Sequence, residues 1–157
     1  MSVTHEFMHD IDAIYGIVTD PQFLVDRCLA LGELSAECEV EEGEDSTLVK
    51  LTRKVDRDLP SALARIFDSV QLMDMREEWL PDGEGWSGSW KIDVQGQPVT
   101  ITANFELTPS RKGCRYSVSH KVKARIPLLG GRVEKYILAQ TEDGARAELD
   151  YIKDYLG

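Results

Sequence analysis

A long helical pattern closes the sequence and limits what the rest of the chain can fold into. An extended stretch from Tyr116 to Ile126 meets Pro127, and the pair Gly130 and Gly131 follows. Apolar side chains then recur three, four or seven positions apart almost to the C-terminus, which places them on one face of a helix. They are Val133, Tyr136, Ile137, Ala147, Tyr151, Ile152 and Tyr155, with Gln140 as a polar member of the stripe. A helix this long needs a broad surface to cover, and the preceding sequence must supply it.

The preceding sequence is typical of antiparallel strands joined by polar turns. Strand-like alternation occupies residues 3–8, 34–41, 49–55, 70–80, 86–94, 99–107 and 114–126. Short helices are expected near residues 13–18, 21–31 and 59–67. Asp10 or Asp12 can cap the first of these helices and Asp20 the second, where Pro21 occupies the first turn. The third helix interrupts the strand series, so we expect it to lie across one end of the sheet.

The turns predict how neighbouring strands pair. The residues expected to face each other beside the turns are Glu42 with Thr47, Trp79 with Trp86, Val94 with Val99, and Leu107 with Cys114. These registers set large side chains opposite small ones on one face, for example Phe105 opposite Gly88, as close packing requires. The alternate positions are polar and are expected to face solvent, so the terminal helix should cover only the other face.

The covered face also carries polar residues, and these are the candidates for a functional site. Glu77, Tyr116, His120 and Arg53 all fall on it. Because an unpartnered buried carboxylate costs several kcal/mol, Glu77 must be paired, protonated or hydrated. One interpretation is a satisfied core network, for instance Glu77 with Arg53; the other is a wet, amphipathic cavity that orients a mostly apolar ligand. The candidate ligand-binding residues are Arg53, Met73, Met75, Glu77, Trp90, Phe105, Tyr116, His120, Leu129, Tyr136 and Gln140.

Length and charge narrow the class of protein. A chain of 157 residues is expected to form one domain, residues 1–157. Its net charge of −10 argues against a nucleic-acid partner, which would need a basic surface, and disfavours anionic membrane surfaces. There is no apolar run of transmembrane length and no basic-then-apolar leader, so we expect a cytoplasmic protein without membrane insertion.

No motif assigns a catalytic residue, a metal site or a cofactor. The three cysteines are odd in number and widely spaced, which predicts reduced thiols instead of a disulfide framework or zinc site. His5 and His120 without a third ligand are too few for a metal centre. A nucleophile elbow, a phosphate loop, HExxH and GxGxxG are all missing from the sequence.

Several stretches resemble the helix-grip, START-like superfamily (SRPBCC), which includes polyketide cyclases and the birch-pollen-allergen fold. Residues 14–23, in which an apolar helix ends at Thr-Asp-Pro, are similar to its first-helix signature, and residues 126–131 resemble its lead into the long helix. Residues 52–53 and 59–60 and the strand around Trp79 look like an uncharacterised bacterial branch. The resemblance implies an α+β fold in which a curved antiparallel sheet of about seven strands wraps around a long C-terminal helix, with two short helices after the first strand.

The resemblance also implies a cavity between the sheet and the long helix, which members use for lipids, sterols, polyketides or plant hormones. We therefore expect binding of a small hydrophobic or amphipathic ligand, lipid- or polyketide-like, without catalysis and without a cofactor. One alternative is a polyketide cyclase- or hydratase-like enzyme that uses Glu77 and His120 as acid and base, with Tyr116 as donor. Another is a protein-interaction module, in which the acidic stretch 37–45 binds a basic partner or its hairpin edge accepts a strand.

Overall fold

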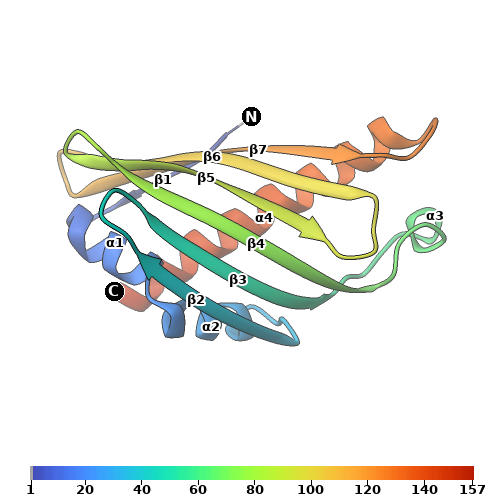
Figure 1. Ribbon diagram of the computed structural model, residues 1–157, viewed down its shortest axis with the longest axis horizontal. Helices are drawn as coiled ribbons and strands as arrows, with labels where there is room; N and C mark the ends of the chain where they lie inside the picture. Colours follow the sequence, from blue (N-terminus) through green and yellow to red (C-terminus); the bar gives the residue numbers. More distant parts are fainter. Residues whose placement is uncertain (1) are drawn as a thin grey trace.

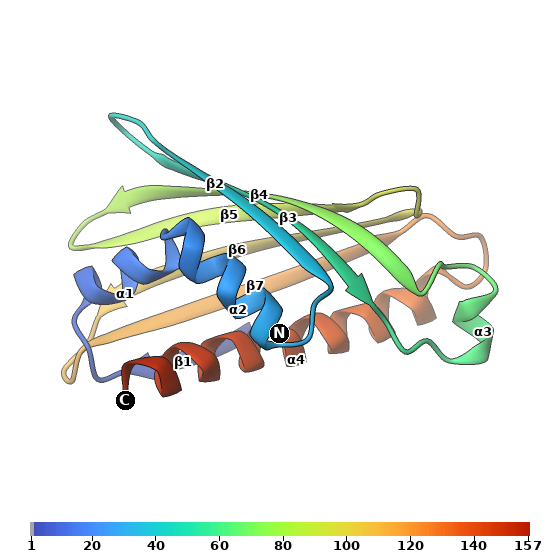
Figure 2. The same ribbon diagram turned by 90° about the horizontal axis from the view of Figure 1, so that it is seen from below.

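The alternating segments build one antiparallel sheet, and the terminal helix lies along one face of it (Figures 1 and 2). The computed structural model describes residues 2–157; Met1, the first residue of the expected domain, lies outside the described residues. The elements are β1 (Ser2–Phe7), α1 (Ile11–Val18), α2 (Pro21–Ala30), β2 (Ser35–Glu42), β3 (Thr47–Asp56), α3 (Ser61–Ala64), β4 (Val70–Asp82), β5 (Gly85–Val94), β6 (Val99–Pro109), β7 (Cys114–Ala124) and α4 (Gly130–Leu156). The seven strands run in the order β1-β7-β6-β5-β4-β3-β2. The expected α+β helix-grip fold is confirmed.

The two helices after β1 begin where their capping residues predict. The side chain of Asp10 accepts a hydrogen bond from the backbone N–H of Ala13 at 2.8 Å, which fixes the start of α1. The side chain of Asp20 accepts from the N–H groups of Gln22 and Phe23, and proline occupies the first turn of α2. These caps set α1 and α2 beside α4, under the same face of the sheet (Figure 2).

Two of the four predicted strand registers are confirmed. Val40 lies opposite Val49 in the hairpin of β2 and β3, and Gly88 lies opposite Phe105 in the hairpin of β5 and β6. Apolar residues face each other in the first hairpin, and a large side chain faces a small one in the second; these pairings are what made the registers predictable.

The other two registers are wrong by two residues. Trp79 lies opposite Gly88, not Trp86, because β4 and β5 continue to Asp82 and Gly85 around a turn in which Gly83 has a φ of +58°. Similarly, β6 continues to Pro109, which places Ala103 opposite His120 instead of Val118. Since a shift of two residues keeps each side chain on its own face, the inward-facing set is unchanged.

Aromatic side chains fill the part of the core nearest α1. The ring of Tyr15 stacks on Trp86 at a centroid distance of 3.9 Å and meets Trp79 edge-on at 5.5 Å. Trp79 contacts Phe105 at 4.5 Å, and Phe105 stacks on Tyr116 at 5.8 Å. Such ring pairs add to the free energy gained by burying the rings themselves. Aromatic contacts therefore dominate the packing in this region of the interior.

The long helix buries a narrower stripe than its sequence pattern suggests. Val133 and Ile152 are buried as expected, and Leu149, which lay outside the predicted stripe, is buried too. Tyr155 was expected to face inward, but 63% of it is exposed; its ring centroid lies 5.1 Å from that of Phe23. None of the helices within residues 2–157 is both long enough and apolar enough to cross a membrane.

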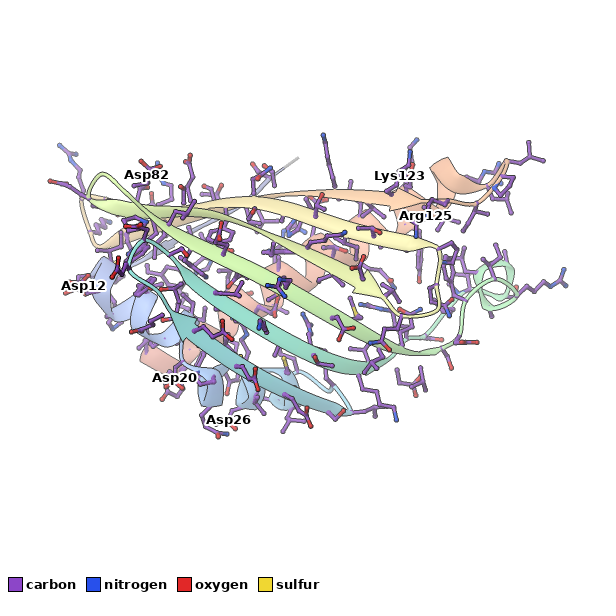
Figure 3. The ribbon with its side chains drawn as sticks, in the orientation of Figure 1. Asp12, Asp20, Asp26, Asp82, Lys123 and Arg125 are labelled. Carbon is purple, nitrogen blue, oxygen red and sulfur yellow. The ribbon has the colours of Figure 1, made fainter. Side chains whose placement is uncertain are left out.

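Charged side chains are distributed unequally along the molecule (Figure 3). Asp12 and Asp82 lie toward the end that carries α1, whereas Lys123 and Arg125 lie at the opposite end, close to the start of α4. Arg132 and Lys135 follow in the first turns of that helix. Basic side chains therefore gather near the start of α4, in a chain whose net charge is −10.

Gly88→Ala should lower the free energy of unfolding by about 2 kcal/mol, since overpacking a filled core costs about 1–3 kcal/mol. An added methyl group would collide with the carbonyl oxygen of Glu78 and the ring of Phe105. Gly144→Ala in α4 is the matched control: a methyl group there meets no atom within 4 Å, and better helix propensity should raise stability by about 0.5–1 kcal/mol. Urea unfolding measures both, and a fully stable Gly88→Ala protein would contradict the tight β4–β5–β6 packing.

Candidate functional site

A cavity of about 450 Å³ lies between the sheet and α4 and reaches the C-terminal end of α2. Its volume is in the range of pockets that hold small organic ligands, roughly 300–1,000 Å³. The sheet contributes an apolar floor that includes Met73, Met75, Trp90, Ile92 and Val118. Methionine adapts to irregular shapes and tryptophan offers a broad contact area, so this floor suits a mostly apolar molecule.

Most of the predicted ligand-binding residues line this cavity. They are Arg53, Met73, Met75, Glu77, Trp90, Tyr116, His120 and Gln140. Tyr136 lies in a smaller adjoining pocket of about 20 Å³, where its hydroxyl accepts a hydrogen bond from Gln140 Nε2 at 2.9 Å. The structure does not bring Phe105 and Leu129 to the cavity. Phe105 is buried in the aromatic packing near α1, and Leu129 is 45% exposed just before α4.

Three charged residues that sequence reasoning missed form the polar wall of the cavity. Glu33 accepts two hydrogen bonds from Arg53, from Nε at 2.8 Å and from Nη2 at 2.6 Å. Glu148 on α4 pairs with Arg27 on α2 at 3.1 Å and lies 3.9 Å from Arg53. The suggested partnership of Glu77 with Arg53 is therefore wrong, because Arg53 is already held by these two carboxylates. Glu148 could have been found, since it falls four residues before Ile152 on the inward stripe.

The ion pairs explain the protonation of this wall. Burial alone would lower the pKa of Arg53, but the carboxylates of Glu148 and Glu33 raise it above its ordinary value. Burial alone would raise the pKa of Glu148, but the neighbouring charges of Arg27 and Arg53 lower it. Arg53 and Glu148 are consequently charged near neutral pH, and together with Arg27 and Glu33 they form a compact network that joins α2, β3 and α4.

Glu77 stands apart from this network. Its side chain is buried, and its Oε1 accepts a hydrogen bond from Trp79 Nε1 at 2.7 Å. Burial raises the pKa of Glu77 to about 7, and the hydrogen bond from Trp79 and the charge of Arg27 offset only part of this effect. Glu77 therefore changes between its neutral and charged forms close to neutral pH.

Tyr116 and His120 add uncharged polar groups to the cavity. Burial, with the nearby charges of Glu77 and Glu148, raises the pKa of Tyr116 well above its ordinary value, so its hydroxyl keeps its proton. Burial lowers the pKa of His120, and its ring lies 5.4 Å from that of Trp90. The Nδ1 atom of His120 is buried and has no hydrogen-bond partner within residues 2–157. A polar group of a ligand, or water, would satisfy it.

The sheet register separates these groups. Glu77, Trp90, Ala103 and His120 stand opposite one another on the successive strands β4, β5, β6 and β7. Three strand spacings separate the backbones of Glu77 and His120, which is about 14 Å measured along the sheet. The two residues therefore stand at different positions along the cavity, and no hydrogen bond joins their side chains within residues 2–157.

The described residues provide no obvious metal centre. Within residues 2–157, no three His, Cys, Asp or Glu side chains are grouped closely enough to hold a metal ion. His5 pairs with Tyr116 across β1 and β7, so it is not the direct cross-strand neighbour of His120.

Comparison with known proteins identifies a family and a fold. A family model described as "Protein of unknown function (DUF2505)" matches residues 2–156. No curated protein matches the sequence. An uncharacterized protein from Rhizobium leguminosarum has a similar structure, with a TM-score of 0.59, 9% identity, and coverage of 99% of this chain and 92% of that one. Ara h 8.0201 is similar with a TM-score of 0.55, 13% identity, and coverage of 97% and 95%. At such identities the likeness shows the fold alone.

The raised pKa of Glu77 predicts a pH-dependent stability. The folded state holds this proton up to a pKa of about 7 and the unfolded state only up to about 4.5. Unfolding between these values releases a proton, so stability falls as pH rises from 4.5 to 7, by about 3 kcal/mol in total. Urea unfolding at pH 5 and pH 8 should show this loss in the wild type and not in Glu77→Gln.

The matched control is Glu78→Gln, one residue along β4 on the exposed face. Glu78→Gln should show the same difference in free energy of unfolding between pH 5 and pH 8 as the wild type. If Glu77→Gln also shows the wild-type difference in free energy of unfolding, the carboxyl group of Glu77 does not titrate near neutral pH.

Proposed function

Because this chain belongs to the DUF2505 family, a family of unknown function, we propose its role from its cavity: it binds a small hydrophobic or amphipathic ligand without transforming it. The observation that carries the proposal is the cavity of about 450 Å³, apolar along the sheet and charged along α2 and α4. Methionine and tryptophan side chains that face such a space lack contacts on one side, and a ligand would restore them. The charged wall and the polar groups would fix the ligand's orientation.

The fold supports this proposal, and it also supports a more specific proposal about the superfamily and the ligand class. Ara h 8.0201 shares the helix-grip arrangement, in which a long helix and a curved sheet enclose an interior space. We take residues 1–157 to act as one START-like domain, related to the polyketide cyclase-like proteins, in the cytoplasm. A lipid- or polyketide-like molecule is the ligand class that an apolar floor with a polar wall would accept.

One observation favours an enzyme as the second candidate. A carboxyl group with a pKa of about 7 is well suited to general acid or base catalysis at neutral pH, and Glu77 has this property. The backbones of Glu77 and its expected partner His120, however, stand about 14 Å apart along the sheet, with Trp90 between them. This spacing favours contact with separate parts of a ligand over joint action on one atom. The enzyme hypothesis would be supported if the wild type turned over a polyketide-like substrate and both Glu77→Ala and His120→Ala abolished that turnover.

The exposed edge of the sheet supports the third candidate, a protein-interaction module. β2 is an edge strand, and Glu37, Glu39, Glu41 and Glu42 along it are exposed. A basic partner captured there would dissociate in high salt, because exposed charges are screened. This role concerns the outer surface and is compatible with a ligand inside the cavity.

Filling the cavity should abolish ligand binding while leaving the fold intact. Ala145 on α4 lines the cavity, and Ala139 on the same helix is exposed outside it. Ala145→Phe should weaken binding of the neutral fluorescent probe N-phenyl-1-naphthylamine by about tenfold or more, because the phenyl ring occupies the ligand's space. Ala139→Phe should bind the probe like the wild type.

Native mass spectrometry of the protein purified from its native host gives the second measurement. The wild type and Ala139→Phe should retain a bound small molecule, and Ala145→Phe should not. Wild-type protein that carries no ligand and does not bind the probe would overturn the proposed function.

A further inference from the structure

Arg57 lies where the main cavity meets the smaller pocket beneath α3. It follows the last residue of β3, and its backbone N–H donates to the carbonyl of Ser69 at 2.7 Å. Its side chain lines both spaces, beside Met73 and across from Gln140 of α4. Figures 1 and 2 show α3 and the first turns of α4 at this same end of the molecule.

Arg57 differs from the two other arginines of the cavity because no carboxylate within residues 2–157 forms an ion pair with it, although its neighbours Asp56 and Asp58 also line the main cavity. Arg27 pairs with Glu148, and Arg53 pairs with Glu33. Within residues 2–157, no Asp or Glu oxygen lies within 4.0 Å of the Arg57 guanidinium. Its one side-chain hydrogen bond runs from Nη2 to the sulfur of Met73 at 3.4 Å, and a thioether is a weak acceptor.

The environment of Arg57 penalises its positive charge. Burial, followed by the neighbouring charge of Arg53, lowers the pKa of Arg57, and the more distant Glu33 offsets only part of this. An arginine nevertheless stays protonated at neutral pH. The cavity thus contains a partly desolvated cation whose stabilisation is incomplete in the protein alone.

The cavity is electrically polar along β4. Met73 lies beside Arg57, and Glu77 follows four residues later on the same strand, about 13 Å further on. A negative group on a ligand would be attracted at the Arg57 end and repelled by Glu77 when that carboxyl is ionised. The apolar floor, including Met75 and Trp90, covers the region near and between these positions.

We propose that the ligand is an amphipathic acid whose anionic head pairs with the guanidinium of Arg57 and whose apolar body extends over Met75 and Trp90. The proposal rests on the proposed function, since it names the ligand class of the same cavity. A guanidinium presents parallel N–H donors that match the oxygens of a carboxylate or a phosphate equally well. Arg57 is then the residue that selects an acid over a neutral molecule of the same length.

Three amphiphiles with the same alkyl chain test the inference: dodecanoate, dodecyl phosphate and dodecanol, each displacing N-phenyl-1-naphthylamine from the protein. Both acids should bind the wild type about tenfold more tightly than the alcohol, as expected for a charge-assisted pair. Whichever of the two acids binds with the higher affinity shows whether the site prefers a carboxylate head or a phosphate head. In Arg57→Gln the preference should disappear, while the affinity for dodecanol stays within about twofold of the wild type.

Arg65→Gln is the matched control, because Arg65 follows α3 at the same end of the molecule but is exposed and outside both pockets. It should retain the full preference for the acids. Thermal unfolding without ligand is the second readout: Arg57→Gln should melt no lower than the wild type, because it removes a charge that the protein leaves unpaired. A clearly lower melting temperature of Arg57→Gln would mean that Arg57 stabilises the fold, and it would contradict a role in ligand binding alone.

The remaining outcomes separate this inference from the proposed function. Dodecanol binding as tightly as the acids would overturn the anionic ligand class and leave cavity binding intact. A preference for acids that persists in Arg57→Gln would overturn the role of Arg57. Wild-type protein that binds neither the probe nor any of the three amphiphiles would overturn the proposed function and the inference with it.

Discussion

A single carboxylate on α4 joins the elements that surround the cavity. Glu148 pairs with Arg27 of α2 and approaches Arg53 of β3, which is itself held by Glu33 in the segment before β2. Burying these groups without water or partners would cost several kcal/mol for each charge. Because the four groups are paired, they can stay buried between α2, β3 and α4. At this point charged side chains, not an apolar stripe, link α4 to the other elements around the cavity.

Aromatic rings and ion pairs occupy different parts of the interior. Near α1, the rings of Tyr15, Trp79, Trp86 and Phe105 fill the space between helix and sheet. The cavity begins beside these rings, because Trp79 lines it, and methionines and charged residues line it further along the sheet. Glu77 lies at the boundary, where the indole of Trp79 donates to its carboxyl. The same fold thus provides a rigid end, which supplies stability, and an open region, which is available for binding.

Most of the fold could be predicted from the sequence, because periodicity of two or of 3.6 residues shows which side chains point inward. Periodicity does not show how far a strand continues into its turn. The predicted pairing of β4 with β5 and of β6 with β7 was therefore wrong by two residues, although each side chain stayed on its predicted face of the sheet. For the same reason, site residues on strands were predictable: Glu77, Tyr116 and His120 are identified by alternation alone. On α4 the pattern predicted Tyr136 and Gln140, but Glu148 was missed although it falls on the inward stripe. Glu33 was missed because it lies in a connection, which has no periodicity.

The separation of charge along the molecule has a consequence that net charge conceals. Acidic residues such as Asp12 and Asp82 lie toward one end, and Lys123 and Arg125 lie at the other (Figure 3). These charges contribute an electric dipole along the molecule. Salt screens such a field over roughly 10 Å at physiological ionic strength, so it acts only close to another charged body. At that range the end with Lys123 and Arg125 is repelled less by a negatively charged surface than the end with Asp12 and Asp82.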